Sequence, residues 1–245
     1  MNEKIKNIFK QTPFIVTMVL VIGILFIPLP ELCYEILFGI ECAFALFIFI
    51  FTFTKLKHYM PRFVLYFSLL SLAIAIGITR LDLNSYTTNT SVRITDLFVK
   101  IVGEKNYIIG MAITVCCLVV EIILIETGST RVIDLVNKKN IKQSDQTITD
   151  DDSSAEKKQM DYYATLDGVS KFLKGQNKAL CFILLVNIVG GIIIQYSVNH
   201  QPIIELETWN FVIRNFIADN FIFYVPLVIV SAAFGIGATR EIENK

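Results

Sequence analysis

Residues 107–125 read YIIGMAITVCCLVVEIILI, a continuous apolar run whose one charged member is Glu121. A helix rises about 1.5 Å per residue, so a run of this length can cross the ~30 Å hydrocarbon core of a bilayer. Lipid offers backbone groups no hydrogen-bond partners, so only helices and closed barrels cross it. The run does not alternate between polar and apolar residues, which indicates a helix. The stretch therefore predicts a membrane-spanning helix.

The same kind of apolar run recurs along the chain, at residues 13–29, 36–53, 62–79, 179–198 and 217–238. Of the 245 residues, 54% are hydrophobic and 18% are charged. A soluble domain of this size rarely carries such a surplus in long segregated runs. Lys plus Arg and Asp plus Glu both number 22, which excludes the basic footprint of a nucleic-acid-binding protein. We predict an all-α polytopic transmembrane bundle of about six spans.

Basic residues gather in alternate connections between the predicted spans. Several lie in the N-terminal segment, in 54–61 and in 126–178, whereas 30–35 has none. The positive-inside rule then predicts that both termini are cytoplasmic. The 80–106 connection fits less well, because it places basic residues on the outer side. From Arg93 onward its apolar residues have helical spacing, which predicts a helix along the membrane interface or packed on the bundle.

The polar stretch 137–161 divides the chain. It reads NKKNIKQSDQTITDDDSSAEKKQMD and has no apolar periodicity, which is typical of a flexible cytoplasmic linker. We therefore predict an N-terminal membrane segment over 1–136, with about four spans, and a C-terminal one over 162–245, with two.

No constellation of a soluble enzyme is present. The chain has no phosphate-binding glycine loop and no HExxH motif, and the predicted topology puts His58 and His200 on opposite sides of the membrane. The five cysteines show no CxxC or Cys/His metal spacing. We expect no enzymatic activity, no cofactor and no bound metal.

Ionisable residues in or beside the spans are the candidates for function. Glu41 lies within the second run, Glu35 at its outer end, Glu121 in the fourth, and Asp219 opens the last. A charge at membrane depth costs roughly 2.5–3.5 kcal/mol, so such residues are usually functional. Desolvation favours the neutral acid, which suits a carboxyl group that takes up and releases protons. The alternatives are an interfacial acid that reaches water, or an acid bonded to a neighbouring helix.

Two local patterns in the C-terminal half can be explained by structural roles. Asp167 and Lys171 lie four residues apart, so they can form an ion pair on a helix, although an N-cap role for Asp167 is the better interpretation of the pattern alone. Small residues allow close approach of helices in lipid. We predict tight helix packing, within or between subunits, at Gly190, Gly191, Gly235 and Gly237.

Several blocks of the sequence resemble one bacterial family. MDYYATLDGVSKFLKG (160–175), followed by NIVGGIII (187–194), resembles DFYGAMDGASKFVRGD followed by NIIGGL. ITRLDL (78–83) resembles STRLIL, and the opening IPLPELCYEILFGIECA (27–43) resembles the IPLP opening of that family. The blocks occur in the same order over nearly the whole chain. They are those of the FHIPEP family of flagellar and type III secretion export-gate proteins.

The resemblance implies a helical inner-membrane protein that assembles as a homo-oligomeric ring and serves proton-driven export of unfolded proteins. Its other implied partners are further export-gate membrane subunits, the exported proteins and the lipid bilayer. The sequence ends at Lys245 without the large cytoplasmic domain of the family. We therefore expect a divergent, membrane-only relative, for which a separate cytoplasmic-domain protein is a further candidate partner.

Charged positions of the family carry over residue by residue, and in the family they are implicated in coupling proton flow to export. The matching or replacing residues, which the resemblance makes candidates for a charged gate, are Asp167, Lys171, Asp219, Arg80, Arg131, Glu35 and Glu41. Glu35 replaces an Asp, and Glu41 replaces an Asn. One family carboxylate is absent, because RGD reads Lys174-Gly175-Gln176 here.

Two other classes of function remain open at this stage. A small-solute secondary transporter would need an internal repeat with paired broken helices, and residues 1–125 and 126–245 show no convincing repeat. A membrane scaffold or accessory subunit without transport would need only the spans and their packing residues.

Overall fold

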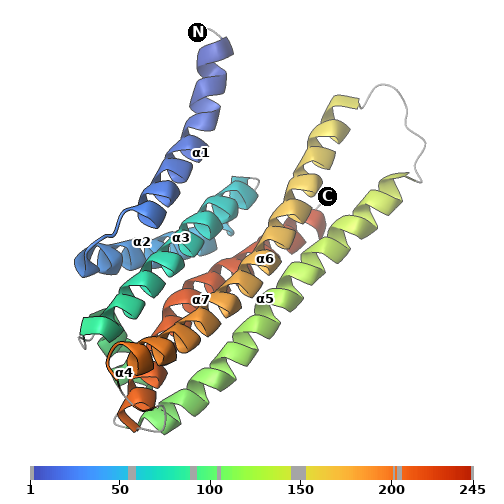
Figure 1. The fold of residues 1–245 in the computed structure, drawn as a ribbon. Helices are drawn as coiled ribbons and strands as arrows, with labels where there is room; N and C mark the ends of the chain where they lie inside the picture. The colour runs from blue at the N-terminus through green and yellow to red at the C-terminus, as the bar shows by residue number, and fades with distance from the viewer. Residues whose placement is uncertain are drawn as a thin grey trace.

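The computed structural model describes residues 3–54, 59–88, 93–103, 106–144, 153–200, 202 and 206–243. Over these ranges the chain forms α-helices and no strand, which confirms the all-α prediction (Figure 1). The helices are α1 (Glu3–Phe26), α2 (Glu31–Phe51), α3 (Met60–Thr88), α4 (Arg93–Gly103), α5 (Tyr107–Ser144), α6 (Ser153–Ser197) and α7 (Leu206–Glu243).

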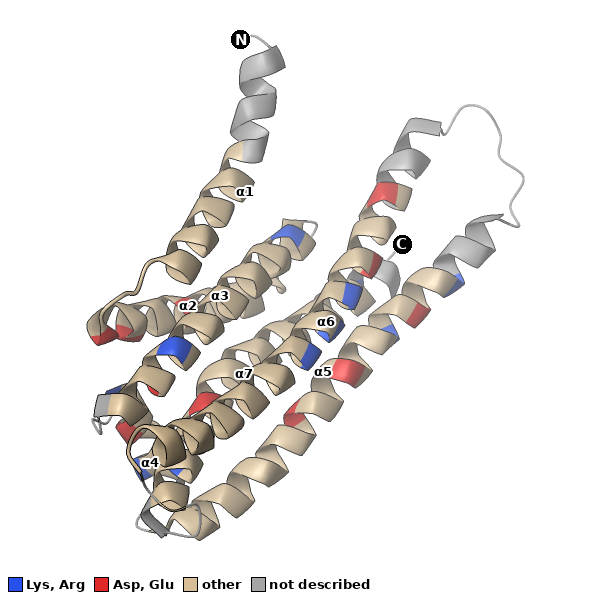
Figure 2. Cartoon of the chain, viewed as in Figure 1, with Lys and Arg blue, Asp and Glu red and all other residues tan. Residues whose placement is uncertain are grey.

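Helix α7 is the central element of the bundle, because it packs against α2, α3, α4, α5 and α6. Helices α3, α5 and α6 run alongside it, and α1 packs on α3 at the edge. In Figure 1 the short helix α4 lies at the end of the bundle where α5 begins. Figure 2 shows charged residues on the upper part of α5 and α6, whereas the lower part of both helices is almost without them. The apolar length of these two helices therefore lies in their lower parts.

Within the described residues, five helices are long and apolar enough to cross a membrane: α2, α3, α5, α6 and α7. They contain five of the six predicted spans. The remaining one, 13–29, falls mostly in α1, whose described apolar part, Thr12–Phe26, is shorter than a full span. Large apolar side chains point outward from these helices, as lipid allows; Ile108 is 74% and Phe182 is 66% exposed.

Helices α5 and α6 both extend into the stretch that the sequence predicts to be a flexible linker. Helix α5 continues to Ser144, and α6 begins at Ser153, so helix occupies much of 137–161. Lys, Gln, Glu and Ala are good helix formers, so a helix can continue where apolar periodicity stops. Residues 145–152 lie outside the described residues. The division into three segments stays a prediction.

The 80–106 connection contains the helix that its apolar spacing predicts, α4. Ile94 and Val99 are buried against the bundle. Phe98 stacks on Phe221 of α7, with ring centroids 6.2 Å apart and an interplanar angle of 6°. The helix therefore packs on the bundle, one of the two placements expected from the sequence.

Glycines bring α6 close to α3. A Cβ added at Gly191 would lie 2.5 Å from the ring of Tyr86, and one at Gly190 would lie 2.8 Å from Leu83. On α7, a Cβ at Gly237 would lie 2.6 Å from Met60. A Cβ at any of these positions would force the neighbouring side chain to shift, which the flexible ends of Leu83 and Met60 allow more easily than the buried ring of Tyr86.

We expect Gly191→Ala to destabilise the protein by about 1–3 kcal/mol, because the added methyl group overpacks the fully buried Tyr86 ring. Gly175→Ala on the same helix is the control, since nothing lies within 4 Å of its added Cβ. It should be neutral or stabilise the helix by about 0.5–1 kcal/mol. Thermal unfolding of the two variants in detergent, followed by circular dichroism, measures both. Equal melting temperatures would contradict the close packing described above.

Candidate functional site

A cluster of polar side chains is buried where α3, α4, α6 and α7 meet. We call it the buried acid cluster and define it by residues that are each at most 3% exposed: Asp82, Thr95, Asn187, Asn215 and Asp219. They come from α3, α4, α6 and, for the last two, α7. Buried polar groups normally find partners inside the protein, so a cluster with unpaired members is where function is expected.

Asp219 is the best-bonded member of the buried acid cluster. Its side chain is fully buried, and its Oδ2 accepts a hydrogen bond of 2.6 Å from the Asn187 amide. Its Oδ1 has no hydrogen-bond partner in the part of the chain that the structure describes. Asn215 lies four residues earlier on α7 and so occupies the same helix face. Helix α7 thus presents an acid and an amide to the same interior site.

An ion pair closes the cluster beside α4. Arg214 of α7 pairs with Asp96 of α4, and its guanidinium also lies 5.6 Å from the ring centroid of Phe211. The contact fastens the short helix α4 onto α7. It also means that the cation nearest to Asp219 along the chain already has a carboxylate partner.

Two further acids lie inside the bundle. Glu41 of α2 is 2% exposed and faces the Ser71 hydroxyl of α3, which donates to its carboxyl group. The Glu41 Oε1 has no partner among the described atoms. Glu121 of α5 is half-buried and accepts a hydrogen bond of 3.2 Å from the amide of Asn220 on α7. Of the acids expected at membrane depth, Glu41 and Asp219 are therefore buried and Glu121 is half-buried, and both Asp219 and Glu121 accept a hydrogen bond from an amide on a neighbouring helix.

Asp167 and Lys171 form an ion pair on the surface of α6. The Lys171 Nζ lies 2.6 Å from the Asp167 Oδ2, and the side chains are 66% and 26% exposed. The N-cap interpretation of Asp167 is wrong, because α6 begins at Ser153 and Asp167 lies well inside the helix. The residues before Asp167 continue the helix toward its N-terminus, a feature that a motif centred on DG does not reveal.

Arg80 closes the end of another helix. Its guanidinium donates to the carbonyl oxygens of Leu25 (3.2 Å) and Ile27 (2.7 Å) and to the Tyr34 hydroxyl (3.0 Å). The last carbonyls of a helix have no partners of their own, so Arg80 satisfies the C-terminal end of α1. Glu35, the next residue after Tyr34, is half-buried and lies outside the buried acid cluster.

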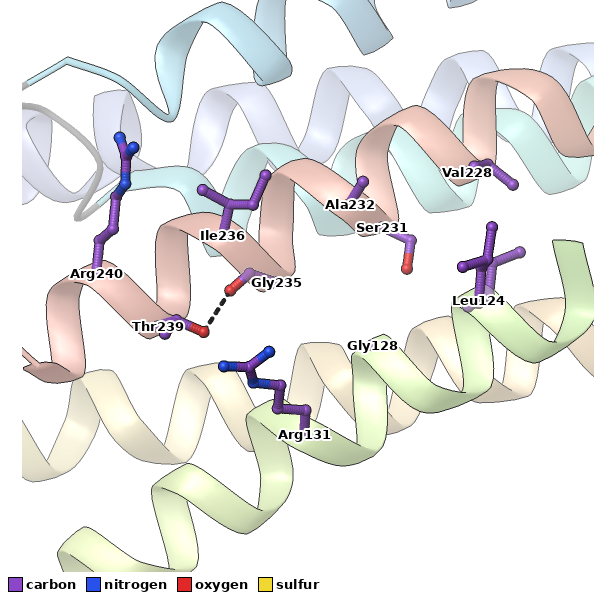
Figure 3. Close-up of a pocket in the computed structure, with 11 residues that line it drawn as sticks. Leu124, Gly128, Arg131, Val228, Ser231, Ala232, Gly235, Ile236, Thr239 and Arg240 are labelled. Carbon is purple, nitrogen blue, oxygen red and sulfur yellow. Dashed lines mark hydrogen bonds between the residues drawn. The ribbon is translucent and has the colours of Figure 1, made fainter.

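A groove of about 450 Å³ opens between α5 and α7, and Arg131 lines it. In Figure 3 the Arg131 side chain points from α5 toward α7, whereas Arg240 turns away from α5. The Arg240 guanidinium lies 4.9 Å from the ring centroid of Phe53. Nothing lies within 4 Å of a Cβ built at Gly235, so this glycine lines the groove, although its spacing predicts a packing contact.

The sequence alone did not single out Asp82, Asn187 or Asn215. The predicted third span ends at residue 79, which places Asp82 in a loop, but α3 continues to Thr88 and carries Asp82 into the interior. The charged residue at the end of an apolar run is the signal that could have found it. Asn187 also carries a signal, because it interrupts the apolar run 179–198 and opens the NIVGGIII block, whereas Asn215 lies before the last predicted span and carries none.

Comparison with known protein families finds one match, which covers most of the chain. The sequence model of the FHIPEP family matches residues 21–136 and 144–245. The chain belongs to the FHIPEP family. No solved structure matches it.

Similar FHIPEP relatives share about a quarter of their residues with the chain. Flagellar biosynthesis protein FlhA of Helicobacter pylori (strain J99 / ATCC 700824) is 26% identical over 279 residues, covering 100% of this chain and 38% of the relative. FlhA of Bacillus subtilis (strain 168) is 26% identical over 249 residues, covering 92% and 36%. FlhA of Escherichia coli (strain K12) is 23% identical over 250 residues, covering 92% and 35%. The FHIPEP chain thus spans little more than a third of the length of these relatives.

We expect Arg80→Gln to destabilise this FHIPEP protein by about 1.5–3 kcal/mol, the usual worth of hydrogen bonds made by a charged group. The variant leaves the terminal carbonyls of α1 without their cationic donor. Arg62→Gln, an exposed arginine on the same helix, is the control and should change little. Thermal unfolding in detergent compares the two. If Arg80→Gln melts like Arg62→Gln, the guanidinium does not hold α1 to α3.

Proposed function

We propose that this chain is a membrane subunit of a bacterial flagellar or type III protein export gate and contributes to proton-driven protein secretion. Its membership of the FHIPEP family supports the proposal, as do relatives named flagellar biosynthesis protein FlhA. The helical bundle, with helices long enough to span a bilayer, is the scaffold that such a subunit needs. We place it in the inner membrane with both termini in the cytoplasm.

The observation that carries the proposal is the fully buried carboxyl group of Asp219 at the junction of α3, α6 and α7. A charged carboxylate accepts the hydrogen bond from Asn187, whereas a protonated carboxyl group can donate one. Protonation and deprotonation of Asp219 therefore change which hydrogen bond it favours with Asn187, and so the contact between α7 and α6. A local change of charge of this kind can bias the packing of whole helices.

Polar residues continue along the buried face of α6 and support a path for protons. This face bears buried hydroxyl and amide groups at Ser170, Gln176, Asn177, Asn187 and Gln195. Asp167 stands at the start of this row and is partly exposed to water. With a rise of about 1.5 Å per residue, the distance along α6 from Asp167 to Asn187 is about 30 Å, which matches the hydrocarbon core. The row thus begins near a partly exposed acid inside α6 and reaches the buried acid cluster at Asn187, with an apolar interval between Asn177 and Asn187.

Assembly follows from the same proposal. An export gate needs several copies of a subunit around a route for the exported protein, so we propose a homo-oligomeric ring together with other export-gate membrane subunits. The groove between α5 and α7, with Arg131 at its edge, lies on the outside of the single chain and is open to such neighbours.

We expect Asp219→Asn and Asp167→Asn each to reduce protein export in the native host by about tenfold or more, a loss typical of a proton-transferring group. The amide keeps the size of the side chain but cannot exchange a proton. Asp134→Asn, an exposed acid on α5, is the control and should export normally. Secreted and membrane-bound protein are quantified by immunoblot. Normal export by both variants at normal membrane levels would refute proton coupling through these acids.

A further inference from the structure

Asp82 is a buried acid to which neither the sequence motifs nor the family comparison gives a role. Its side chain is fully buried, and both carboxylate oxygens lack a hydrogen-bond partner in the part of the chain that the structure describes. In the family motif that ITRLDL resembles, STRLIL, the corresponding position is isoleucine. A charged carboxylate without partners in a water-free interior is strongly unfavourable, so Asp82 must hold a proton itself or accept a hydrogen bond from a neighbour that holds one.

Asp219 is that neighbour. The two carboxyl groups, one on α3 and the other on α7, interact directly inside the buried acid cluster. The Thr95 hydroxyl of α4 faces Asp82, and the Asn187 amide of α6 donates to Asp219 from the other side. Helices α3 and α7 therefore each contribute one carboxyl group to a common centre, which α4 and α6 shield from water.

The other ionisable groups facing the pair cannot neutralise it. Arg214 of α7 is the facing cation, and it is already paired with Asp96 of α4. Tyr86 of α3 lies beside both carboxyl groups and is neutral at physiological pH. From α6 the facing group is the uncharged amide of Asn187. Two carboxylates in contact and out of water cannot both be ionised, so a proton between them is the simplest resolution.

We propose that Asp82 and Asp219 form one proton-binding centre, in which a single proton is shared between the two carboxyl groups. The shared state is one carboxyl group donating to the other as a carboxylate, with a net charge of minus one for the pair. A second proton, taken from water, makes the pair neutral, and its release to water restores the shared state. The part of this inference that concerns export rests on the proposed function, whereas the shared proton itself does not.

The shared proton can be measured without any assay of secretion. The full chain is reconstituted in lipid nanodiscs with side-chain ¹³C-labelled aspartate, and infrared spectroscopy records the carbonyl band of protonated aspartic acid at pH 7. The label separates this band from any band of Glu41. We expect a band in the wild type, its loss in Asp82→Asn, and an equal loss in Asp219→Asn, because each amide donates to the remaining carboxylate.

The double variant provides the test of sharing. One proton held jointly predicts that the double variant loses no more intensity than either single variant, since interacting sites are not additive. Glu121→Gln, an acid on α5 outside the pair, is the control and should keep the band. Thermal unfolding verifies that each near-isosteric variant folds. If one single variant does not fold, the loss of the band in the other still tests the shared proton.

The outcomes are distinct for the two proposals. Absence of an aspartic acid band in the wild type, or its survival in Asp82→Asn, overturns the shared proton. Two half-losses that add in the double variant also overturn it, because they indicate two independent acids. Loss of the band with unchanged export of Asp82→Asn would leave the shared proton standing and remove its role in export. Export by Asp82→Asn should instead fall together with that of Asp219→Asn.

Discussion

The exclusion of water around Asp219 is the constraint on which the rest of the structure depends. In water a carboxylate is solvated from all sides, but inside this bundle its partners must come from other helices. Asn187 reaches it from α6, and Asp82 approaches from α3. The arrangement of these helices around α7 is therefore also the arrangement of the polar groups that make a buried acid tolerable.

Close packing makes this arrangement possible. Between helices in lipid the hydrophobic effect offers little driving force, so association depends on van der Waals contact and on polar bonds. Gly190 and Gly191 let Leu83 and Tyr86 lie directly on the backbone of α6. Both side chains follow Asp82 on the same helix, one and four residues later. The small residues of α6 thus bring the acid of α3 within reach of α7.

The charged residues that match the family pattern differ here in their burial and in their bonding partners. Arg80 satisfies the end of α1 by hydrogen bonds to backbone carbonyls, which is a structural task. Asp167 and Lys171 pair with each other on a partly wet surface, where an ion pair contributes little to stability. Asp219 is out of water altogether. Family resemblance identifies these positions together, but burial separates them.

Sequence by itself determined that the chain is a set of apolar helices, because a continuous apolar run in lipid has no other stable form than a helix that satisfies its own backbone. It also determined the family and singled out Asp219 as an acid in an apolar run. Tertiary structure decided which polar groups meet. Asp82 looked like a loop residue at the end of a span, and Asp167 looked like a helix cap, until the lengths of α3 and α6 were known. The reason is that periodicity reports the environment of one helix face, whereas the contact of Asp82 with Asp219 depends on how two helices far apart in the sequence pack, and no local pattern encodes that distance.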